Sequence, residues 1–597
     1  MAMGQTVADS KIGRNDRVAK GLRPSAGAMG KMPMPRSCGT GVPPVAAERS
    51  PKPEAASLRF SAPVVPPSGG MGSSRKMAEG CGGEHGRAVS SIARARGHLP
   101  IHRLWRLIAL PILLAAQASA ADAPRRPNIL WLIGENICLD LGCYGAKGVA
   151  TPNLDRLAAE GVRYTRVFST NPACAPSRSA FFTGMYQTTT DTHNMRSHRE
   201  DDFRLPAGVR PITHWLRDAG YFTANIKTIG DLPVGTGKLD LNFANEGPIY
   251  MSDDWSTLKL RRPFFAVVNS HEVEYDIYDR KSAKKDRVEW VGEREHPRVA
   301  TPENVTPPPY YPDHPVVREE WARYLNSVSG MDRRIGWVLE RLREDGLEDD
   351  TAVIFFADNG RLEPRGIHWC YDSGLHVPLI IRWPKNFPRP AQIMPGGVCD
   401  QVISLIDVTA TTLAIAGESR PPTMQGRTFL GEGADPPRQY AFSARDRIDE
   451  TVQRVRSVRD ARWHYIRNFT PGPTFASLNR YKEKCFIIVP LMRELMAQGK
   501  LTGPAAELMA MRGPSEELYD TAIDPHEVRN LADSSIPGHR EALLRMRAAL
   551  DAWIAETGDR GQWPEPRDVV APFEKEMHDW FGTPPWAGQG PVGGRTE

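Results

Sequence analysis

The chain has 597 residues with 76 basic and 71 acidic side chains, a length that fits two to four domains and excludes a peptide hormone or a disulfide miniprotein. Hydrophobic residues make up 40% and charged residues 25%, as in globular proteins, so most of the chain can bury a core. Beyond residue 120 the chain is net acidic by about six charges, which gives no support to nucleic-acid binding.

The first 120 residues differ in composition from the rest. Residues 1–98 are rich in Gly, Pro, Ser, Ala and Arg, and they predict a disordered extension or a gene start placed too early. Residues 99–120 then run from basic through apolar to small side chains, which is typical of a secretory signal peptide cleaved after Ala120. The apolar run is too short for a stable membrane span, so we expect export to the periplasm or beyond. A buried helix or an N-terminal anchor is the alternative.

The next part of the chain alternates between predicted strands and helices. Residues 127–133 form an apolar run rich in branched side chains, which predicts a strand buried on both faces. Apolar residues at helical spacing predict helices over 151–161 and 335–346. Further buried strands are expected at residues 263–268, 351–356 and 377–381. This alternation predicts an α/β fold with a mostly parallel sheet.

Two of the predicted strands end in an acidic residue followed by an amide. Glu135 and Asn136 follow the first strand, and Asp358 and Asn359 follow the strand at 351–356. The carboxyl ends of parallel strands line the ligand crevice of such sheets, so we expect these four side chains to converge. Converging carboxylates repel each other unless a cation lies between them, and oxygen donors suit Ca²⁺, or less well Mg²⁺, better than zinc. The alternative is that these residues only cap turns.

A short segment between these pairs carries a recognisable motif. It reads Cys174-Ala-Pro-Ser-Arg178 and is followed by Thr183-Gly184. This resembles the signature of the type I, formylglycine-dependent sulfatases. The resemblance implies that a formylglycine-generating maturation enzyme oxidises Cys174, that the aldehyde hydrate attacks sulfur and contacts the metal, and that Arg178 holds the hydrate and the ligand carboxylates.

The resemblance extends from about residue 126 to residue 531 and implies further site residues. Lys238, in a Gly-Lys pair, is similar to the family's sulfate-contacting lysine, and His271 is similar to the histidine that protonates the leaving group or binds sulfate. His193 is a candidate to line the substrate pocket, although a plain loop histidine is the alternative. Apart from the resemblance, Lys238 would be a solvated loop lysine and His271 a strand-end histidine held by local hydrogen bonds.

The chain departs from the family pattern at three places. The first metal pair is Glu135-Asn136 where the family usually has two aspartates, which removes one formal charge. Asp240 stands where histidine is common, and Ile367 stands where the family places a sulfate-binding lysine or arginine. Arg365 and His368 are the candidates to replace that missing cation.

The second half of the chain is similar to the heparan N-sulfatase branch, which contains the relatives of N-sulfoglucosamine sulfohydrolase. The implied fold is the alkaline phosphatase-like sulfatase fold, with a large mixed, mostly parallel sheet flanked by helices and a smaller C-terminal α+β subdomain. We expect the catalytic domain at residues 121–435 and the smaller subdomain with the tail at 436–597.

The implied activity is hydrolysis of sulfate esters or sulfamates of sulfated sugars. One alternative is a phosphoester or phosphonate hydrolase of the same superfamily. Another is a weakly active or non-catalytic glycan-binding relative, which the three departures would favour. The sequence leaves the sugar, the position of the sulfate, the disulfide pairing and the oligomeric state open.

Overall fold

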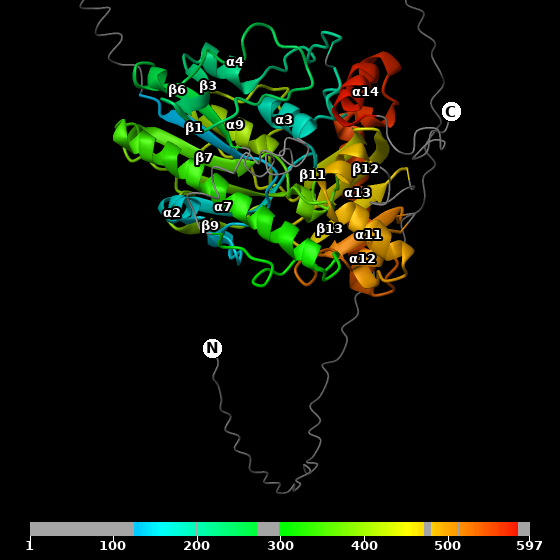
Figure 1. Ribbon diagram of the computed structural model, residues 1–597. Helices are drawn as coiled ribbons and strands as arrows, with labels where there is room; N and C mark the ends of the chain where they lie inside the picture. The colour runs from blue at the N-terminus through cyan, green and yellow to red at the C-terminus, as the bar shows by residue number, and fades with distance from the viewer. Residues whose placement is uncertain (1–124, 199, 271–297, 471–478, 511–512, 583–597) are drawn as a thin grey trace, which may run out of the picture. The chain divides into compact units, whose positions relative to one another are not determined.

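The computed structural model describes residues 125–198, 200–270, 298–470, 479–510 and 513–582. These residues belong to one compact unit that contains a ten-stranded and a four-stranded sheet (Figure 1). The predicted N-terminal extension and signal peptide, residues 1–120, lie outside the described residues, as does His271. Within the described residues, no helix is long and apolar enough to cross a bilayer.

The larger sheet is mixed and mostly parallel, as the sequence predicts. Its strands follow the order β10-β2-β8-β7-β1-β6-β3-β4, with β5 beside β3 and β9 beside β2. Pairing is antiparallel only where β8 meets β2 and β7, and where β4 meets β3. The strands are β1 (Asn128–Gly134), β2 (Val162–Phe168), β3 (Phe222–Ile229), β4 (Leu232–Pro233), β5 (Ser252–Asp254), β6 (Phe264–Ser270), β7 (Thr351–Ala357), β8 (His376–Arg382), β9 (Gly397–Cys399) and β10 (Ile403–Ser404).

Helices cover the larger sheet on both faces. The two helices α2 (Pro152–Glu160) and α7 (Pro315–Glu344) pack against each other. On the opposite face, α3 (Cys174–Thr183), α4 (Ile212–Asp218) and α9 (Ile406–Ile415) form a second group (Figure 1). Short helical segments complete this part: η1 (Gly142–Tyr144), η2 (Trp255–Lys259), η3 (Glu348–Asp350) and α8 (Asp372–Leu375). Coverage on both faces explains why β1, β6 and β7 are apolar and buried along their whole length.

A buried tryptophan fixes the position of α3 on the sheet. Trp131, in the central strand β1, makes edge-on ring contacts with Phe181 and Phe182 of α3 and with Phe356 of β7. Its indole Nε1 donates a hydrogen bond to Thr412 Oγ1 of α9 at 3.1 Å. Such aromatic pairs contribute about 0.5–1.5 kcal/mol each beyond the burial of their area. They hold the first residue of α3 near the carboxyl ends of the central strands.

The C-terminal part is a smaller α+β unit, which agrees with the predicted subdomain. Its four antiparallel strands, β11 (Ala441–Ile448), β12 (Thr451–Arg459), β13 (Trp463–Asn468) and β14 (Glu516–Asp520), follow chain order. The helix α13 (Pro537–Thr557) packs on β12 and β13. The remaining helices are α10 (Arg480–Cys485), α11 (Ile488–Ala497), α12 (Gly503–Leu508), η4 (Arg560–Gln562) and α14 (Arg567–Phe581).

Candidate active site

The two acidic-amide pairs lie side by side, because β1 and β7 are parallel neighbours with Gly134 opposite Ala357. The amide of Asn359 donates through Nδ2 to Asn136 Oδ1 at 2.8 Å. The backbone N–H of Asn136 donates to Asp358 Oδ1 at 3.2 Å. Asn136 adopts the left-handed conformation, with a φ of 58°, which asparagine tolerates better than most residues. The four predicted ligands thus converge as their strand positions require.

Arg178 connects the carboxylates that end these strands. Its Nε donates to Asp358 Oδ2 at 3.0 Å, and Nη2 donates to Glu135 Oε1 at 3.0 Å. All three side chains are inaccessible to solvent. Burial alone would lower the pKa of Arg178, but the charges of Asp358 and Glu135 outweigh it and raise the pKa above its ordinary value. The arginine therefore stays charged and fixes both carboxylates.

A residue that the sequence analysis did not select completes the hold on Arg178. Asn269, near the end of β6, accepts a hydrogen bond from Arg178 Nη1 through Oδ1 at 2.8 Å. Its Nδ2 donates to Asn225 Oδ1 at 3.0 Å, and Asn225 in turn donates to the carbonyl of Gly237 at 2.9 Å. A signal was present in the sequence, because Asn269 is polar at the end of an apolar strand.

Lys238 reaches the same group of residues from the loop after β4. Its Nζ lies 2.7 Å from Glu135 Oε2, the carboxylate oxygen that Arg178 does not contact. The preceding Gly237 has a φ of 69°, and a Cβ there would collide with the side chain of Lys227. The left-handed φ therefore favours glycine in the turn that presents Lys238. The two carboxylates of Glu135 and Asp358 are thus paired with two cations, Arg178 and Lys238.

Cys174 is the first residue of α3 and lies beside the acidic-amide pairs. Its Sγ is 3.9 Å from Asn136 Oδ1, and the residue is buried. Ser177, one turn into the helix, donates through Oγ to the carbonyl of Asp358 at 2.5 Å, which holds the helix start against the end of β7. The N–H groups at the start of a helix favour an anion. No disulfide joins any two of the described cysteines.

The segment around His193 lines the same region. Asn242 donates through Nδ2 to the carbonyls of Thr192 and Asn194, and its backbone N–H donates to Ser179 Oγ of α3 at 2.9 Å. His193 is buried, with Nδ1 3.7 Å from Asp191 Oδ1. Asn242 thereby connects the His193 segment to α3 through hydrogen bonds.

The two candidates for the missing cation lie in different surroundings. Arg365 donates to the carbonyls of His526 and Glu527, at 3.2 and 2.6 Å, and stacks over the ring of Tyr371. His368 is buried, has a φ of 78°, and donates its backbone N–H to the carbonyl of Pro172, two residues before Cys174, at 2.8 Å. The backbone of His368 thus lies beside the segment that leads into Cys174, whereas the guanidinium of Arg365 is held by carbonyls of residues 526 and 527.

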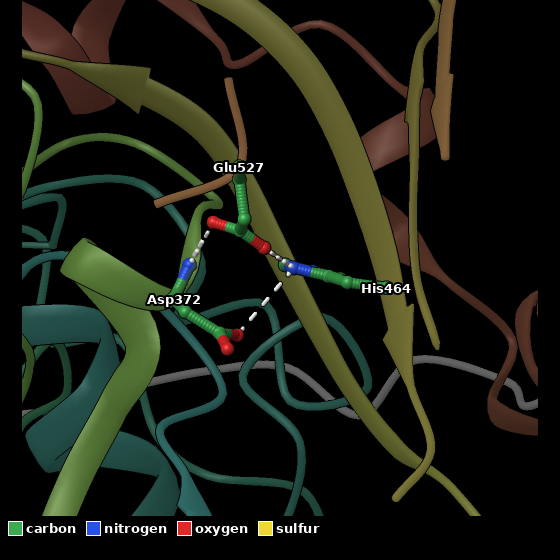
Figure 2. Close-up of side chains that lie close together, drawn as sticks. All are labelled: Asp372, His464 and Glu527. Atoms are coloured by element: carbon green, nitrogen blue, oxygen red, sulfur yellow. Dashed lines mark hydrogen bonds and ion pairs between the residues drawn. The ribbon is translucent and has the colours of Figure 1, made fainter. Parts of the chain in front are cut away.

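A separate group of His and carboxylate side chains links helix α8 to the smaller sheet (Figure 2). His464 of β13 places Nδ1 2.5 Å from Glu527 Oε1 and 3.5 Å from Asp372 Oδ1. The three offered ligand atoms lie within 4.8 Å of one another, the spacing of a metal-binding group. Arg459 also contacts Asp372, at 3.3 Å, so a guanidinium supplies the positive charge that a metal ion would otherwise bring to this group. We interpret this group as an ion-pair network between α8 and the smaller sheet.

Comparisons with known proteins identify related sequences over most of the described chain. Residues 127–231 and 251–418 match the sulfatase family model, and residues 366–480 match the model for the C-terminal part of N-sulphoglucosamine sulphohydrolase. An ulvan-active sulfatase of Formosa agariphila is 32% identical over 492 residues, which cover 75% of this chain and 78% of that protein. The human N-sulphoglucosamine sulphohydrolase is 27% identical over 483 residues, 73% of this chain and 91% of that protein.

The fold is also found among solved structures. A putative sulfatase from Bacteroides thetaiotaomicron superposes with a TM-score of 0.51 and 19% identity, covering 74% of this chain and 96% of that one. The sequence matches and the shared fold together identify a hydrolase of sulfuric esters. The chain belongs to the sulfatase family, in the branch of N-sulphoglucosamine sulphohydrolase.

Proposed function

We propose that this protein hydrolyses sulfate esters or sulfamates of sulfated sugars, with formylglycine formed from Cys174 as the nucleophile and with a bound Ca²⁺. The observation that carries the proposal is the position of Cys174, at the start of α3 and 3.9 Å from Asn136 in the group of convergent oxygens. The names of the ulvan-active and N-sulphoglucosamine relatives support a sulfated sugar as substrate.

The residues present fit an oxygen-liganded divalent cation. Glu135, Asn136, Asp358 and Asn359 offer two carboxylates and two amide oxygens, all buried. Asn359 Oδ1 is buried without a hydrogen-bond partner, as expected of an atom reserved for a ligand. This hard oxygen set suits Ca²⁺, with Mg²⁺ less favoured because it requires stricter octahedral geometry. When bound, such an ion supplies Lewis acidity at a sulfate oxygen and at residue 174.

The charges of the chain favour a bound anion once a cation is present. Glu135 and Asp358 are balanced by Arg178 and Lys238. Among the described residues, a divalent cation would therefore add positive charge beyond this balance, which a sulfate group would offset. The start of α3 adds its partial positive charge at the same place.

Each side chain then has a specific task. As a formylglycine hydrate, residue 174 supplies one hydroxyl to attack sulfur and a second whose deprotonation releases sulfate and restores the aldehyde. Arg178 keeps the two ligand carboxylates in place, and Lys238 lies where it can contact the sulfate group. We assign protonation of the departing sugar oxygen or nitrogen to His271, which lies outside the described residues.

Three further points remain proposals. We propose that residues 99–120 direct export and are removed, and that a formylglycine-generating enzyme matures the protein. We also place the boundary between the catalytic domain and the smaller subdomain near residue 435. The end of α9 at Ile415 and the start of β11 at Ala441 support that boundary.

The test is release of free sulfate by the matured protein from glucosamine N-sulfate, beside a panel of O-sulfated sugars and matched phosphate and phosphonate esters. We expect multiple turnovers on at least one sulfated sugar and none with Cys174→Ala. Faster hydrolysis of the phosphorus esters would favour the phosphoester hydrolase instead. The absence of any turnover by protein with confirmed formylglycine would favour the glycan-binding alternative.

A further inference from the structure

One buried arginine of the smaller subdomain, Arg445, forms no ion pair with an acidic residue in the described part of the chain. Arg445, in β11, is 2% exposed, and the only hydrogen bond of its side chain among the described residues joins Nη1 to the side-chain oxygen of Gln453. Its Nε is buried and makes no hydrogen bond. The neighbouring arginines differ: Arg456 is paired with Asp446 and Asp559, and Arg447 with Glu565. A buried guanidinium that lacks a carboxylate is unusual, because burial of a charge is costly unless the charge is paired.

Two other basic side chains face the same position. Lys482 of α10 is buried and donates through Nζ to the carbonyls of Pro364 and Ile367, at 2.7 and 3.1 Å. Both cations lie over the ring of Trp369, with Arg445 Cζ 4.9 Å and Lys482 Nζ 5.1 Å from the ring centroid. His368, the next residue along the chain from Ile367, is buried in the same group. We call Arg445, Lys482 and His368 the Arg445 cluster.

The acids that act on Arg445 or Lys482 are Asp446, Asp449 and Glu363, and none of these described residues forms an ion pair with Arg445. Burial, only partly offset by the acidic groups around it, lowers the pKa of Arg445 to about 10. Burial and the charge of Arg445 also lower the pKa of Lys482 well below its ordinary value. The acid that faces both cations is Asp449, and burial raises its pKa. A ring contact with Trp369 offsets only part of the cost of burying two cations.

The Arg445 cluster lies beside the segment that leads into Cys174. His368 donates its backbone N–H to the carbonyl of Pro172 at 2.8 Å. On the smaller sheet, the residue before Arg445, Ala444, donates its N–H to the carbonyl of Thr170 and accepts a hydrogen bond from the Asn171 side chain at 2.7 Å. Residues 170–172 are thus held by the neighbours of the cluster on both sides. An anion in the cluster would therefore lie next to the segment that leads into Cys174.

We propose that the Arg445 cluster is an anion-binding subsite that accepts a second acidic group of the glycan, either a carboxylate or a further sulfate, while the scissile sulfate lies at Cys174. The inference rests on the proposed function, because it assumes that a sulfated glycan occupies the site. It makes the enzyme selective for glycans with at least two acidic groups. An oxyanion in the subsite pairs with Arg445 and gives its guanidinium the acidic partner that the described residues do not supply.

The test compares matched substrates with the matured full-length protein. One pair is a sulfated disaccharide containing a uronic acid and its carboxyl-reduced, neutral counterpart. The other is glucosamine with an N-sulfate and a 6-O-sulfate beside glucosamine with the N-sulfate alone. We expect Arg445→Met to lower kcat/KM for the more acidic member of a pair at least tenfold more than for its partner. A change in the ratio for the uronate pair indicates that the subsite binds a carboxylate, and a change for the disulfate pair indicates that it binds a second sulfate.

Arg462→Met is the matched control, because Arg462 also stacks over a tryptophan, Trp463, but is exposed and paired with Asp520. The control should leave the ratio within each pair unchanged. Arg445→Met should not lower the melting temperature, since it removes an unpaired buried charge. If it does, Lys482→Gln provides the second variant, with the same expected change in ratio.

A binding measurement separates this inference from the proposed function. In Cys174→Ala protein, the uronate-containing disaccharide without its sulfate should bind, and adding Arg445→Met should weaken that binding at least tenfold by calorimetry. If this binding is observed but the matured wild-type protein releases no sulfate from any sulfated sugar, the subsite is supported and the proposed hydrolysis is rejected. The subsite would be overturned, and the hydrolysis left intact, by a different result. In that result the wild type releases sulfate, Arg445→Met lowers kcat/KM equally for both members of each pair, and Arg445→Met does not weaken binding of the desulfated disaccharide.

Discussion

Arg178 and Asp358 are 180 residues apart in sequence, yet Arg178 Nε donates to Asp358 Oδ2 at 3.0 Å in the solvent-free interior. The same guanidinium also holds Glu135, so one side chain fixes the acids at the ends of two neighbouring strands. The arrangement connects the signature helix to the proposed metal site. It also makes Arg178 a residue on which both stability and activity depend.

Replacing Arg178 should therefore damage both properties. Arg178→Met leaves Glu135 and Asp358 buried without their main partner, and breaking a buried pair in this way costs about 3–5 kcal/mol. We expect this loss in the free energy of unfolding, measured by denaturant titration, together with at least a hundredfold lower kcat for sulfate release. Arg462→Met, at an exposed arginine, should change either value little. If Arg178→Met were as stable as the wild type, the ion pairs of Arg178 with Glu135 and Asp358 would not stabilise the fold as proposed.

The amide at position 136 should limit the affinity for the metal. Asn136→Asp restores a carboxylate beside Asp358, and aspartate also tolerates the left-handed φ of 58°. We expect a lower melting temperature without Ca²⁺, because two carboxylates then repel, and a larger rise on adding Ca²⁺. A thermal-shift titration with Ca²⁺ and Mg²⁺ measures both effects. The prediction is rejected if Ca²⁺ stabilises the variant less than it stabilises the wild type.

The network around Asp372 predicts a loss of stability in acid. Burial raises the pKa of Asp372, but Arg459, His464 and His376 outweigh it and lower the pKa to about 2. Because this pKa lies below that of the unfolded chain, the carboxylate stabilises the fold above about pH 4, and the stabilisation is lost as the pH falls toward 2. The effect amounts to about 1–3 kcal/mol. Asp372→Asn should therefore lose less stability than the wild type between about pH 4 and 2, when the free energy of unfolding is measured against pH for both proteins. Parallel curves for the two proteins would contradict this prediction.

The contact between α3 and the sheet should also be sensitive to truncation. Phe181 is completely buried and contacts Trp131 and Phe356 edge-on. Phe181→Ala removes these contacts and leaves a cavity, which costs about 3–5 kcal/mol in the free energy of unfolding. Phe181→Leu should cost markedly less because it keeps most of the volume. Equal losses for the two variants, measured by denaturant titration, would show that packing at Phe181 is not what holds the helix.

The strand ends were predictable because strong local signals mark them. The apolar runs of β1 and β7 are buried on both faces, and the parallel pairing brings Glu135 and Asp358 to one edge of the sheet. The position of α7 was only partly predictable. The sequence predicts a helix from about residue 335, whereas α7 begins at Pro315, because buried polar or small residues such as Ser327 and Asp332 interrupt its apolar pattern.

The Arg445 cluster could not be predicted from the sequence. Arg445 follows the signature cysteine by more than 270 residues and stands in a run of three consecutive charged residues, Arg445-Asp446-Arg447, which is typical of an exposed segment. Its burial depends on contacts between the smaller sheet and residues 170–172. For the same reason the sequence could not show that the guanidinium of Arg365 donates hydrogen bonds to the distant carbonyls of His526 and Glu527.

The central claim is that residue 174 acts as formylglycine. The most direct test is to prepare samples with different degrees of maturation, measure the fraction of residue 174 converted to the aldehyde by peptide mass spectrometry, and measure sulfate release from the best sulfated sugar in each sample. The account predicts a rate proportional to that fraction and zero at no conversion. A rate independent of the fraction, or turnover by Cys174→Ala, would contradict it.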